Sequence, residues 1–143
     1  MLLFPLLHPP LITALATAGH GSRVLIADGN YPHSTGVGPG VVKVYLNLRP
    51  GLLGVDDILD AVAQAIPIES AAVMVPADGA PVPAQLGYRE RLAGVPFEEL
   101  GRFEFYDAAR GPDVAVMIAS ADQRVFANLL LTVGVRIDDP SLA

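Results

Sequence analysis

The chain has 143 residues, of which 52% are apolar and 17% are charged, whereas an ordinary soluble domain carries roughly 25% charged residues. Its net charge is −6, and its nine lysines and arginines form no basic run that could follow a phosphate backbone, which argues against a nucleic-acid partner. The absence of cysteine excludes disulfides, thiolate metal sites and thiol nucleophiles, and it fits a reducing compartment. We expect one domain over residues 1–143, and the apolar excess predicts that a partner subunit covers part of its surface.

The first 18 residues are apolar enough to raise the question of a signal peptide. They contain no lysine or arginine, and Pro5, Pro9 and Pro10 interrupt the run, so we expect them to belong to the fold. No stretch of the chain reaches the roughly 18 uninterrupted apolar residues that suggest a membrane span. Pro9 and Pro10 favour the start of a helix, and Gly19 favours its end.

Strands and helices then alternate. The run RVLIA at 23–27 predicts a strand buried on both faces, with Asp28 at its carboxyl end. Residues 30–40 are a loop by composition, and VVKVYLNL at 41–48 alternates like a second strand. A helix is predicted from Asp56 and Asp57 to about residue 65, with Pro67 as its stop.

The second half of the chain continues the alternation. AAVMV at 71–75 predicts a buried strand, and residues 83–93 predict a charged helix. Three further strands are predicted at 102–106, 113–120 and 126–135. The resulting order predicts an α/β fold, a single-domain α/β/α sandwich with a mainly parallel sheet. Ligands of such sheets bind beyond the carboxyl ends of the strands, which is where Asp28 is expected.

The three histidines differ in their surroundings. His8, in a proline-rich apolar segment, is interpreted as structural, and His33 lies in a glycine-rich loop where it is either solvated or part of a site. His20 is flanked by glycines that let a ligand approach the imidazole, a side chain suited to proton transfer near neutral pH. Eight extended residues span about 26 Å, so His20 and Asp28 lie at opposite ends of the strand. If one site uses both, either residues 19–22 fold back or two subunits share the site.

Other signals are weaker. The glycines at 36–40 lack the Lys-Ser/Thr of a phosphate loop, and no spacing of Asp, Glu and His supports a metal site. Asp56-Asp57 and the pair at 98–99 are interpreted as helix-start or surface carboxylates. Asn128 stands in an apolar run, where a buried amide must be hydrogen-bonded, either to backbone groups or to a ligand hydroxyl.

Several strings together resemble a known family. These are HPPLITALATAGHG at 8–21, VLIADGNYP at 24–32, RFEFYDAA at 102–109 and FANLLLTVGV at 126–135. In this order, over nearly the whole chain, they resemble the fucose mutarotase and ribose pyranase family. The resemblance implies an α/β sandwich assembled into rings, often a decamer of two pentamers, with a monosaccharide site at subunit contacts. It implies no cofactor and no metal.

The resemblance also assigns roles to residues. His20 corresponds to the proton-donating histidine of the family, Asp28 to its sugar-binding aspartate and Arg102 to the arginine that fucose-type members use on the sugar. The segment that closes the site corresponds to Phe126, Ala127 and Asn128. Both branches usually carry tyrosine where this chain has Phe126, so one hydroxyl is missing.

Arg102, together with Phe105-Tyr106-Asp107, favours the fucose branch, because ribose-type members resemble one another in having histidine near the position of Arg102. The resemblance therefore predicts a cytoplasmic, cofactor-independent mutarotase that interconverts the anomers of a reducing monosaccharide, in the first place L-fucose. Two alternatives stay open, a ribose pyranase that interconverts pyranose and furanose forms, and a non-catalytic monosaccharide-binding protein. None of the three needs nucleic acid or a membrane.

Overall fold

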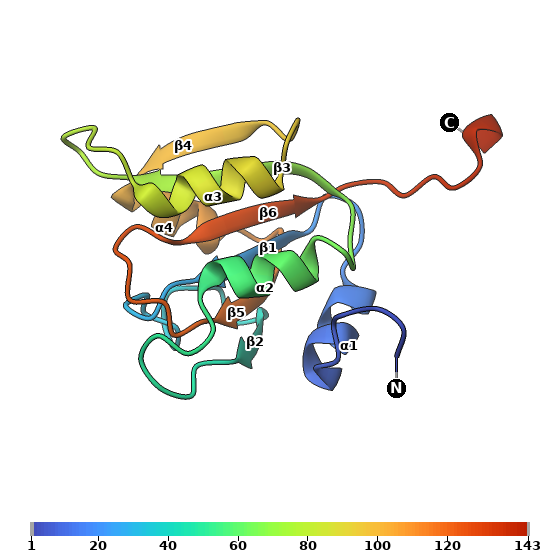
Figure 1. Cartoon of the computed structure of the whole chain (residues 1–143), viewed down its shortest axis with the longest axis horizontal. Coiled ribbons are helices and arrows are strands. Elements are labelled where there is room, and N and C mark those ends of the chain that lie inside the picture. Colours follow the sequence, from blue (N-terminus) through green and yellow to red (C-terminus); the bar gives the residue numbers. More distant parts are fainter. Residues whose placement is uncertain (1, 143) are drawn as a thin grey trace.

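The computed structural model describes residues 2–142, and its centre is one six-stranded sheet (Figure 1). In chain order the strands are β1 (Arg23–Ala27), β2 (Val42–Tyr45), β3 (Ile68–Val75), β4 (Phe97–Gly101), β5 (Val114–Ala119) and β6 (Leu129–Val133). The helices are α1 (Pro9–Thr17), α2 (Val55–Val62), α3 (Pro83–Arg91) and α4 (Arg102–Ala109), with a short 3₁₀ turn η1 at Pro140–Leu142. Across the sheet the strand order is β2-β5-β1-β6-β3-β4.

The strand directions bring the predicted site residues to one edge of the sheet. β1, β2 and β5 run parallel, β3 and β4 run parallel, and β6 is antiparallel to both of its neighbours, β1 and β3. Five strands therefore end at the edge where β6 begins. Asp28 directly follows β1, Arg102 directly follows β4, and Asn128 directly precedes β6. The mainly parallel sheet of the prediction is confirmed.

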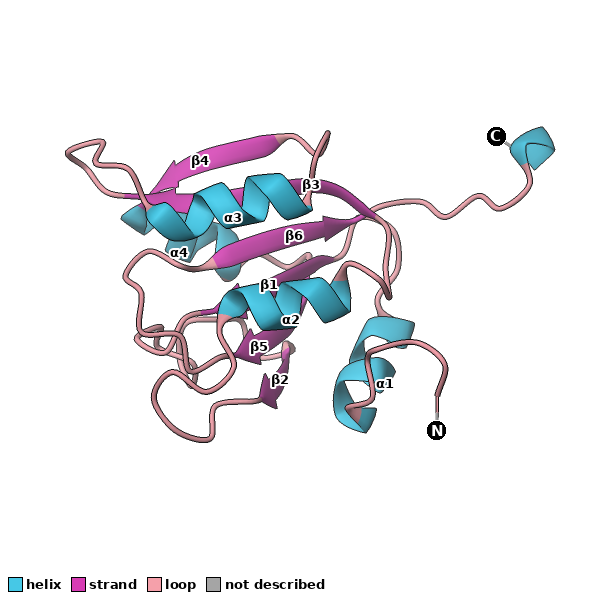
Figure 2. Ribbon diagram, in the orientation of Figure 1, coloured by secondary structure: helices cyan, strands magenta, loops and turns pink. Residues whose placement is uncertain are grey.

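Helices cover both faces of the sheet (Figure 2). On one face, α1, α2 and α3 contribute Leu11, Leu59 and Tyr88 to a buried apolar cluster with one side of the strands. On the other face, α4 contributes Phe105 to a second cluster, which the loop after β1 completes with Tyr31. The α/β/α sandwich predicted from the sequence is thus confirmed.

The predicted strand at 102–106 is wrong, because these residues form the first turns of α4. The alternation of RFEFY suggested that Phe103 and Phe105 share one face, but Phe103 is 77% exposed and Phe105 is fully buried. Gly101 precedes the helix, and its backbone amide donates to the Glu104 carboxylate, a contact that favours a helix start. The sixth strand is instead β4, where Glu98 and Glu99 are exposed, as expected for surface carboxylates.

Three other predicted strands have clearly different ends, and one of them, predicted at 41–48, is confined to Val42–Tyr45. The strand predicted from 71 begins at Ile68, and the strand predicted at 126–135 is confined to Leu129–Val133. Phe126 takes a φ of 58°, a left-handed conformation that no strand residue adopts. The chain therefore turns at Phe126 and enters the sheet only after Asn128.

The N-terminal segment packs onto the fold as a capped helix, whereas the C-terminal segment extends away from it. Near the N-terminus, His8 caps α1, because its Nδ1 accepts a hydrogen bond from the Leu11 amide at 3.3 Å, which confirms its structural role. Within residues 2–142, no helix combines the length and apolar character needed to cross a membrane. After β6 the chain leaves the body of the molecule (Figure 1), and it exposes Val135, Ile137 and Leu142.

Candidate functional site

A cavity of about 250 Å³ opens at the edge where five strands end. Ligand pockets measure roughly 300–1,000 Å³, so this cavity lies just below the lower end of that range. Four predicted site residues line it, namely Asp28, Arg102, Phe126 and Asn128. The remaining lining residues are Asn30, Tyr31, Met74, Tyr106 and Val125. The cavity therefore joins four segments that lie far apart in the sequence.

Asp28 is buried, with 3% of its surface exposed, and its carboxylate is held from two sides. Oδ1 accepts a hydrogen bond from the Asn30 amide at 2.9 Å, and Oδ2 accepts one from Nδ2 of Asn128 at 2.8 Å. Within residues 2–142, no Lys, Arg or His nitrogen lies within ion-pair distance of this carboxylate. Asp28 is thus oriented without having its charge neutralised.

Burial raises the pKa of Asp28 above its ordinary value, because desolvation disfavours the charged carboxylate. The backbone amides of Asn30, Ala127 and Tyr31 oppose this shift, while the charge of Asp122 adds to it. A buried carboxyl with a raised pKa at a cavity wall is a common mark of a functional site. Such a group can accept a hydrogen bond from a ligand hydroxyl or exchange a proton with it.

Asn128 is hydrogen-bonded on both ends of its amide, as the sequence required of a buried amide. Its Oδ1 accepts from the backbone amide of Asp28 at 2.9 Å while its Nδ2 donates to the Asp28 carboxylate. The second hydrogen on Nδ2 is still available to a ligand. The structure thus brings together two predicted residues that are 100 positions apart in the chain.

Phe126 and Ala127 set the path of this segment. Phe126 is half-buried and lines the cavity, and its left-handed backbone costs about 1–2 kcal/mol in a non-glycine residue. Ala127 is fully buried, and its carbonyl accepts a hydrogen bond from the hydroxyl of Tyr88 on α3 at 2.8 Å. Ala127 itself is not among the residues that line the cavity.

Arg102, Tyr106 and Tyr31 form one wall of the cavity. The Arg102 guanidinium carbon lies 5.7 Å from the centre of the Tyr106 ring, and the rings of Tyr106 and Tyr31 are 5.6 Å apart. Arg102 is exposed at the start of α4, and within residues 2–142 no carboxylate lies within ion-pair distance of it. Its donors can therefore reach a ligand hydroxyl or carboxylate.

One aromatic residue that lines the cavity, Tyr31, was not singled out from the sequence, and His33 lies next to it without lining the cavity. Tyr31 is buried, and its hydroxyl donates to the carbonyl of Gly36 at 2.8 Å. His33, which the sequence left open, lies beside it with Nε2 at 2.8 Å from the carbonyl oxygen of Asp28. The available signal was their position, since both follow Asp28 within five residues in a loop at the carboxyl end of a strand.

Of the predicted site residues, Ala127 lies in the wall segment without lining the cavity, and His20 lies elsewhere. It precedes β1, whereas Asp28 follows it, so the two residues are at opposite ends of this strand, as the sequence predicted. The segment between Gly19 and Ser22 does not fold back, because Gly21 pairs with Val133 at the far end of β6. The imidazole is exposed, and its Nε2 lies 3.0 Å from a carboxylate oxygen of Glu69. Within one chain, His20 therefore does not reach the cavity.

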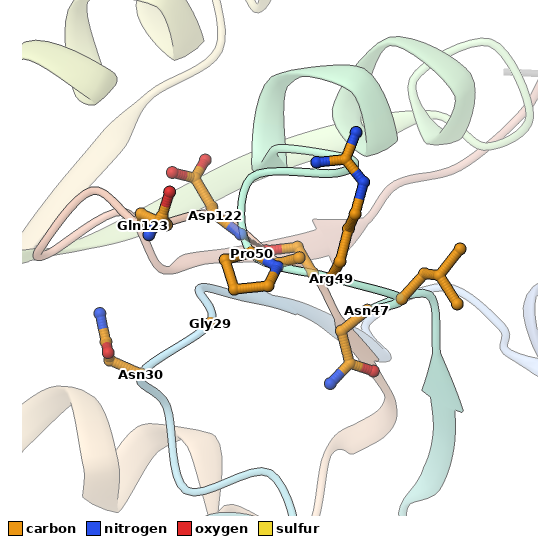
Figure 3. Close-up of a pocket in the computed structure, with 10 residues that line it drawn as sticks. Gly29, Asn30, Asn47, Arg49, Pro50, Asp122 and Gln123 are labelled. Carbon is orange, nitrogen blue, oxygen red and sulfur yellow. Dashed lines mark hydrogen bonds between the residues drawn. The ribbon is translucent and has the colours of Figure 1, made fainter.

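A second, larger hollow of about 380 Å³ lies along the same edge, beyond β2, β5 and β1 (Figure 3). Asn30, which also lines the first cavity, faces it from one side, and Gln123 and the loop carrying Asn47 and Arg49 surround the rest. These four side chains are exposed, and none of the predicted site residues lines this hollow. The buried side chains of Ser120 and Asp122 also line it, but the Asp122 carboxylate is already paired with Arg124. The smaller cavity contains the Asp28 carboxylate, which has no cationic partner within residues 2–142, and is therefore the candidate site.

Comparisons with known proteins agree with the resemblance seen in the sequence. A family model described as the RbsD / FucU transport protein family matches residues 1–136. Fucose mutarotase from Bos taurus is 33% identical over 91% of this chain and 90% of that protein. D-Ribose pyranase from Paracidovorax citrulli is 32% identical over 91% of this chain and 95% of that protein.

A solved structure extends the agreement to the fold. Bacillus subtilis RbsD complexed with D-ribose matches this chain with a TM-score of 0.82 at 25% identity, over 96% of this chain and 100% of that one. Sequence and fold thus point to the same relatives along almost the whole chain. The chain belongs to the RbsD / FucU family.

Proposed function

We propose that the protein is a cofactor-independent sugar mutarotase that interconverts the anomers of L-fucose. The observation that carries the proposal is the meeting of Asp28, Arg102 and Asn128 in one small cavity, in a chain 33% identical to the fucose mutarotase of Bos taurus. Carboxylate, guanidinium and amide groups are donors and acceptors that can recognise sugar hydroxyls. The monosaccharide is the only substrate this reaction needs.

The reaction consists of two proton transfers and one reversible bond cleavage. The anomeric hydroxyl gives its proton to a base, which is Asp28, a water molecule or a group of the neighbouring subunit. The ring oxygen gains a proton, and the bond between the anomeric carbon and the ring oxygen breaks to give an open aldehyde. Rotation about the adjacent carbon–carbon bond and reclosure on the other face of the carbonyl give the other anomer. General acid–base catalysis contributes about 10²–10⁴-fold, which is enough for a reaction that already proceeds slowly in water.

The residues divide these tasks. His20 protonates the ring oxygen, while Asp28 accepts a hydrogen bond from a sugar hydroxyl and Arg102 donates to another. Asn128 fixes Asp28 and offers its remaining amide hydrogen to the sugar. Phe126 packs against the ring, with no hydroxyl of its own to add.

Because His20 cannot reach the cavity of its own chain, we place the site between two copies of the chain. Two features support this arrangement. First, His20 is exposed, and it lies near the end of β6 because the neighbouring Gly21 bonds to Val133. Second, the segment that follows β6 carries the exposed apolar residues Val135 and Ile137. We propose a homo-oligomer of pentameric rings or a decamer, located in the cytoplasm, where a chain without cysteine loses nothing to reduction.

A ribose pyranase is the second candidate, favoured by the 32% identity to the Paracidovorax citrulli enzyme and by the fold match to a ribose complex. It would use the same proton transfers but reclose the ring through a different hydroxyl. Arg102 favours the fucose reaction. Its side chain lines the cavity, whereas ribose-type members resemble one another in having histidine near this position. A protein that binds the sugar without catalysis is the third reading, suggested by the missing hydroxyl at Phe126.

Saturation-difference NMR of anomer exchange separates the three. We expect the protein to accelerate exchange between the anomers of L-fucose, and the His20→Ala variant to lose this acceleration while keeping its oligomeric state. Faster interconversion of the pyranose and furanose forms of D-ribose, with no effect on fucose, would establish the pyranase. Binding of either sugar without faster exchange would establish the binding protein, and recovery of exchange by Phe126→Tyr would then explain it.

A further inference from the structure

Two buried polar side chains on α3 contact the backbone of the cavity wall from behind. Gln85 is 7% exposed and Tyr88 is fully buried, although α3 is otherwise a charged surface helix. Nε2 of Gln85 donates to the carbonyl of Met74 at 2.7 Å, and the Tyr88 hydroxyl donates to the carbonyl of Ala127 at 2.8 Å. Met74 lines the cavity, and Ala127 stands between two residues that line it.

The segment held by Tyr88 lies outside the hydrogen-bonded ladder of the sheet. Phe126 takes a left-handed backbone conformation, and the ladder between β6 and its neighbours begins only at Leu129. Strained conformations persist where surrounding contacts enforce them. The Tyr88 hydroxyl is such a contact, since it meets the carbonyl of the residue directly after Phe126.

Two residues of this segment, Ala127 and Asn128, contact Asp28 directly. The Ala127 amide is among the backbone groups that favour the charged form of Asp28, and Asn128 makes both of its amide bonds to Asp28. A shift of the Ala127 carbonyl moves the amide on one side of this residue and Asn128 on the other. The chain of contacts therefore runs from Tyr88 through Ala127 and Asn128 to the Asp28 carboxylate.

We infer that Tyr88 is a positioning residue for the sugar site, which fixes the orientation of Asp28 by clamping the Phe126–Asn128 segment. The inference rests on the proposed function for its kinetic consequence alone. The ring of Tyr88 fills the apolar cluster beneath the sheet, and the hydroxyl provides the clamp. These two roles can be separated, because Tyr88→Phe keeps the ring and removes only the hydroxyl.

The test compares Tyr88→Phe with Ile58→Val, a control that trims one methyl group from the same buried cluster on α2. Hydrogen exchange at the backbone amides of Ala127 and Asn128 is followed by NMR, and mutarotation of L-fucose is measured in parallel. We expect Tyr88→Phe to accelerate exchange at these two amides about tenfold and to lower kcat/KM about tenfold, with most of the loss in kcat.

The outcomes are distinct. Unchanged exchange at Ala127 and Asn128 in Tyr88→Phe, or equal changes in Ile58→Val, would overturn the inference and leave Tyr88 as a packing residue. If the wild-type protein accelerates no anomer exchange, the proposed function fails. The amide exchange rates still decide whether Tyr88 clamps the segment.

Discussion

Two aspartates at the same edge of the sheet are equally buried, but their pKa values are shifted in opposite directions. Asp28 follows β1 and Asp122 lies in the loop after the neighbouring strand β5, and they are 3% and 4% exposed. Each accepts hydrogen bonds from backbone amides, from Asn30 in one case and from Val55 and Arg124 in the other. Local burial and backbone contacts thus treat the two carboxylates alike.

The difference is one guanidinium. Burial tends to raise the pKa of Asp122, but the hydrogen bonds from the Arg124 side chain and from the Val55 and Arg124 amides lower it below its ordinary value. Arg124 also pairs with Asp56, which ties the loop after β5 to α2. Asp28 has an amide, Asn128, where Asp122 has a cation. A fully compensated carboxylate stabilises the fold, and one left without a cation can still act on a ligand.

The largest expected effect separates the two residues by activity. Asp28→Asn should lower kcat/KM for anomer exchange about 100-fold, because each decade corresponds to 1.36 kcal/mol and a hydrogen bond to a charged group contributes about 1.5–3 kcal/mol. The kcat/KM of Asp122→Asn, calculated per folded protein, should stay within a few-fold of the wild-type value. Equal losses in the two variants, measured by NMR of anomer exchange, would remove the distinction.

Stability should separate them in the opposite sense. Asp122→Asn removes the negative charge beside Arg124 and replaces one of the two acceptor oxygens by an NH2 group, so some of the donors from Val55 and Arg124 lose their acceptor. We expect it to lower the free energy of unfolding by about 1–3 kcal/mol at pH 7. Because the folded pKa of Asp122 is lowered, its contribution is present above the unfolded value of 3.8 and is lost as pH falls through the folded pKa.

Asp28 should show the reverse pH dependence. Its folded pKa is raised, so its contribution is complete below 3.8 and is lost as pH rises through the folded pKa. Thermal unfolding between about pH 2.5 and 7 checks both signs. With rising pH, the Tm of Asp28→Asn should increase relative to wild type, and that of Asp122→Asn should decrease. Parallel pH curves for the two variants would contradict the assignment.

A smaller effect is expected where the loop after β1 supports Tyr31. A Cβ at Gly36 would lie 2.5 Å from Cε1 of Tyr31 and 2.9 Å from a ring carbon of Pro32, so Gly36→Ala must displace the tyrosine at the cavity wall. Overpacking costs about 1–3 kcal/mol, and we expect KM for L-fucose to rise about fivefold. Gly40→Ala is the matched control, since no atom lies within 4 Å of its added Cβ. A KM for Gly36→Ala no higher than that of the control would show that Tyr31 does not shape the site.

The sequence predicted those parts of the site that local patterns determine. A buried strand followed by Asp28 was sufficient to place that carboxylate at the ligand-binding edge. An amide in an apolar run was sufficient to predict that Asn128 has hydrogen-bond partners. The identity of the partner was not predictable, because Asp28 lies 100 residues away and meets Asn128 only through the pairing of β1 with β6.

Two failures have physical causes. RFEFY alternates like a strand, yet the contact between Gly101 and Glu104 and the burial of Phe105 and Ala109, one helical turn apart, favour a helix. Asp122 gave no signal in the sequence, since its role depends on Val55 and Asp56 in a distant helix. At Asp122 tertiary contacts outweigh the local pattern, and at residues 102–106 a local helix-capping contact and the burial of Phe105 outweigh the strand-like alternation.

Subunit complementation tests the central claim most directly. His20→Ala and Asp28→Asn chains should each be inactive alone, and coexpressed chains should recover about one quarter of the wild-type rate, because a site shared between copies is complete only where one copy supplies Asp28 and its neighbour supplies His20. NMR of L-fucose anomer exchange measures the recovery. No recovery in a mixed oligomer of confirmed composition would contradict the account.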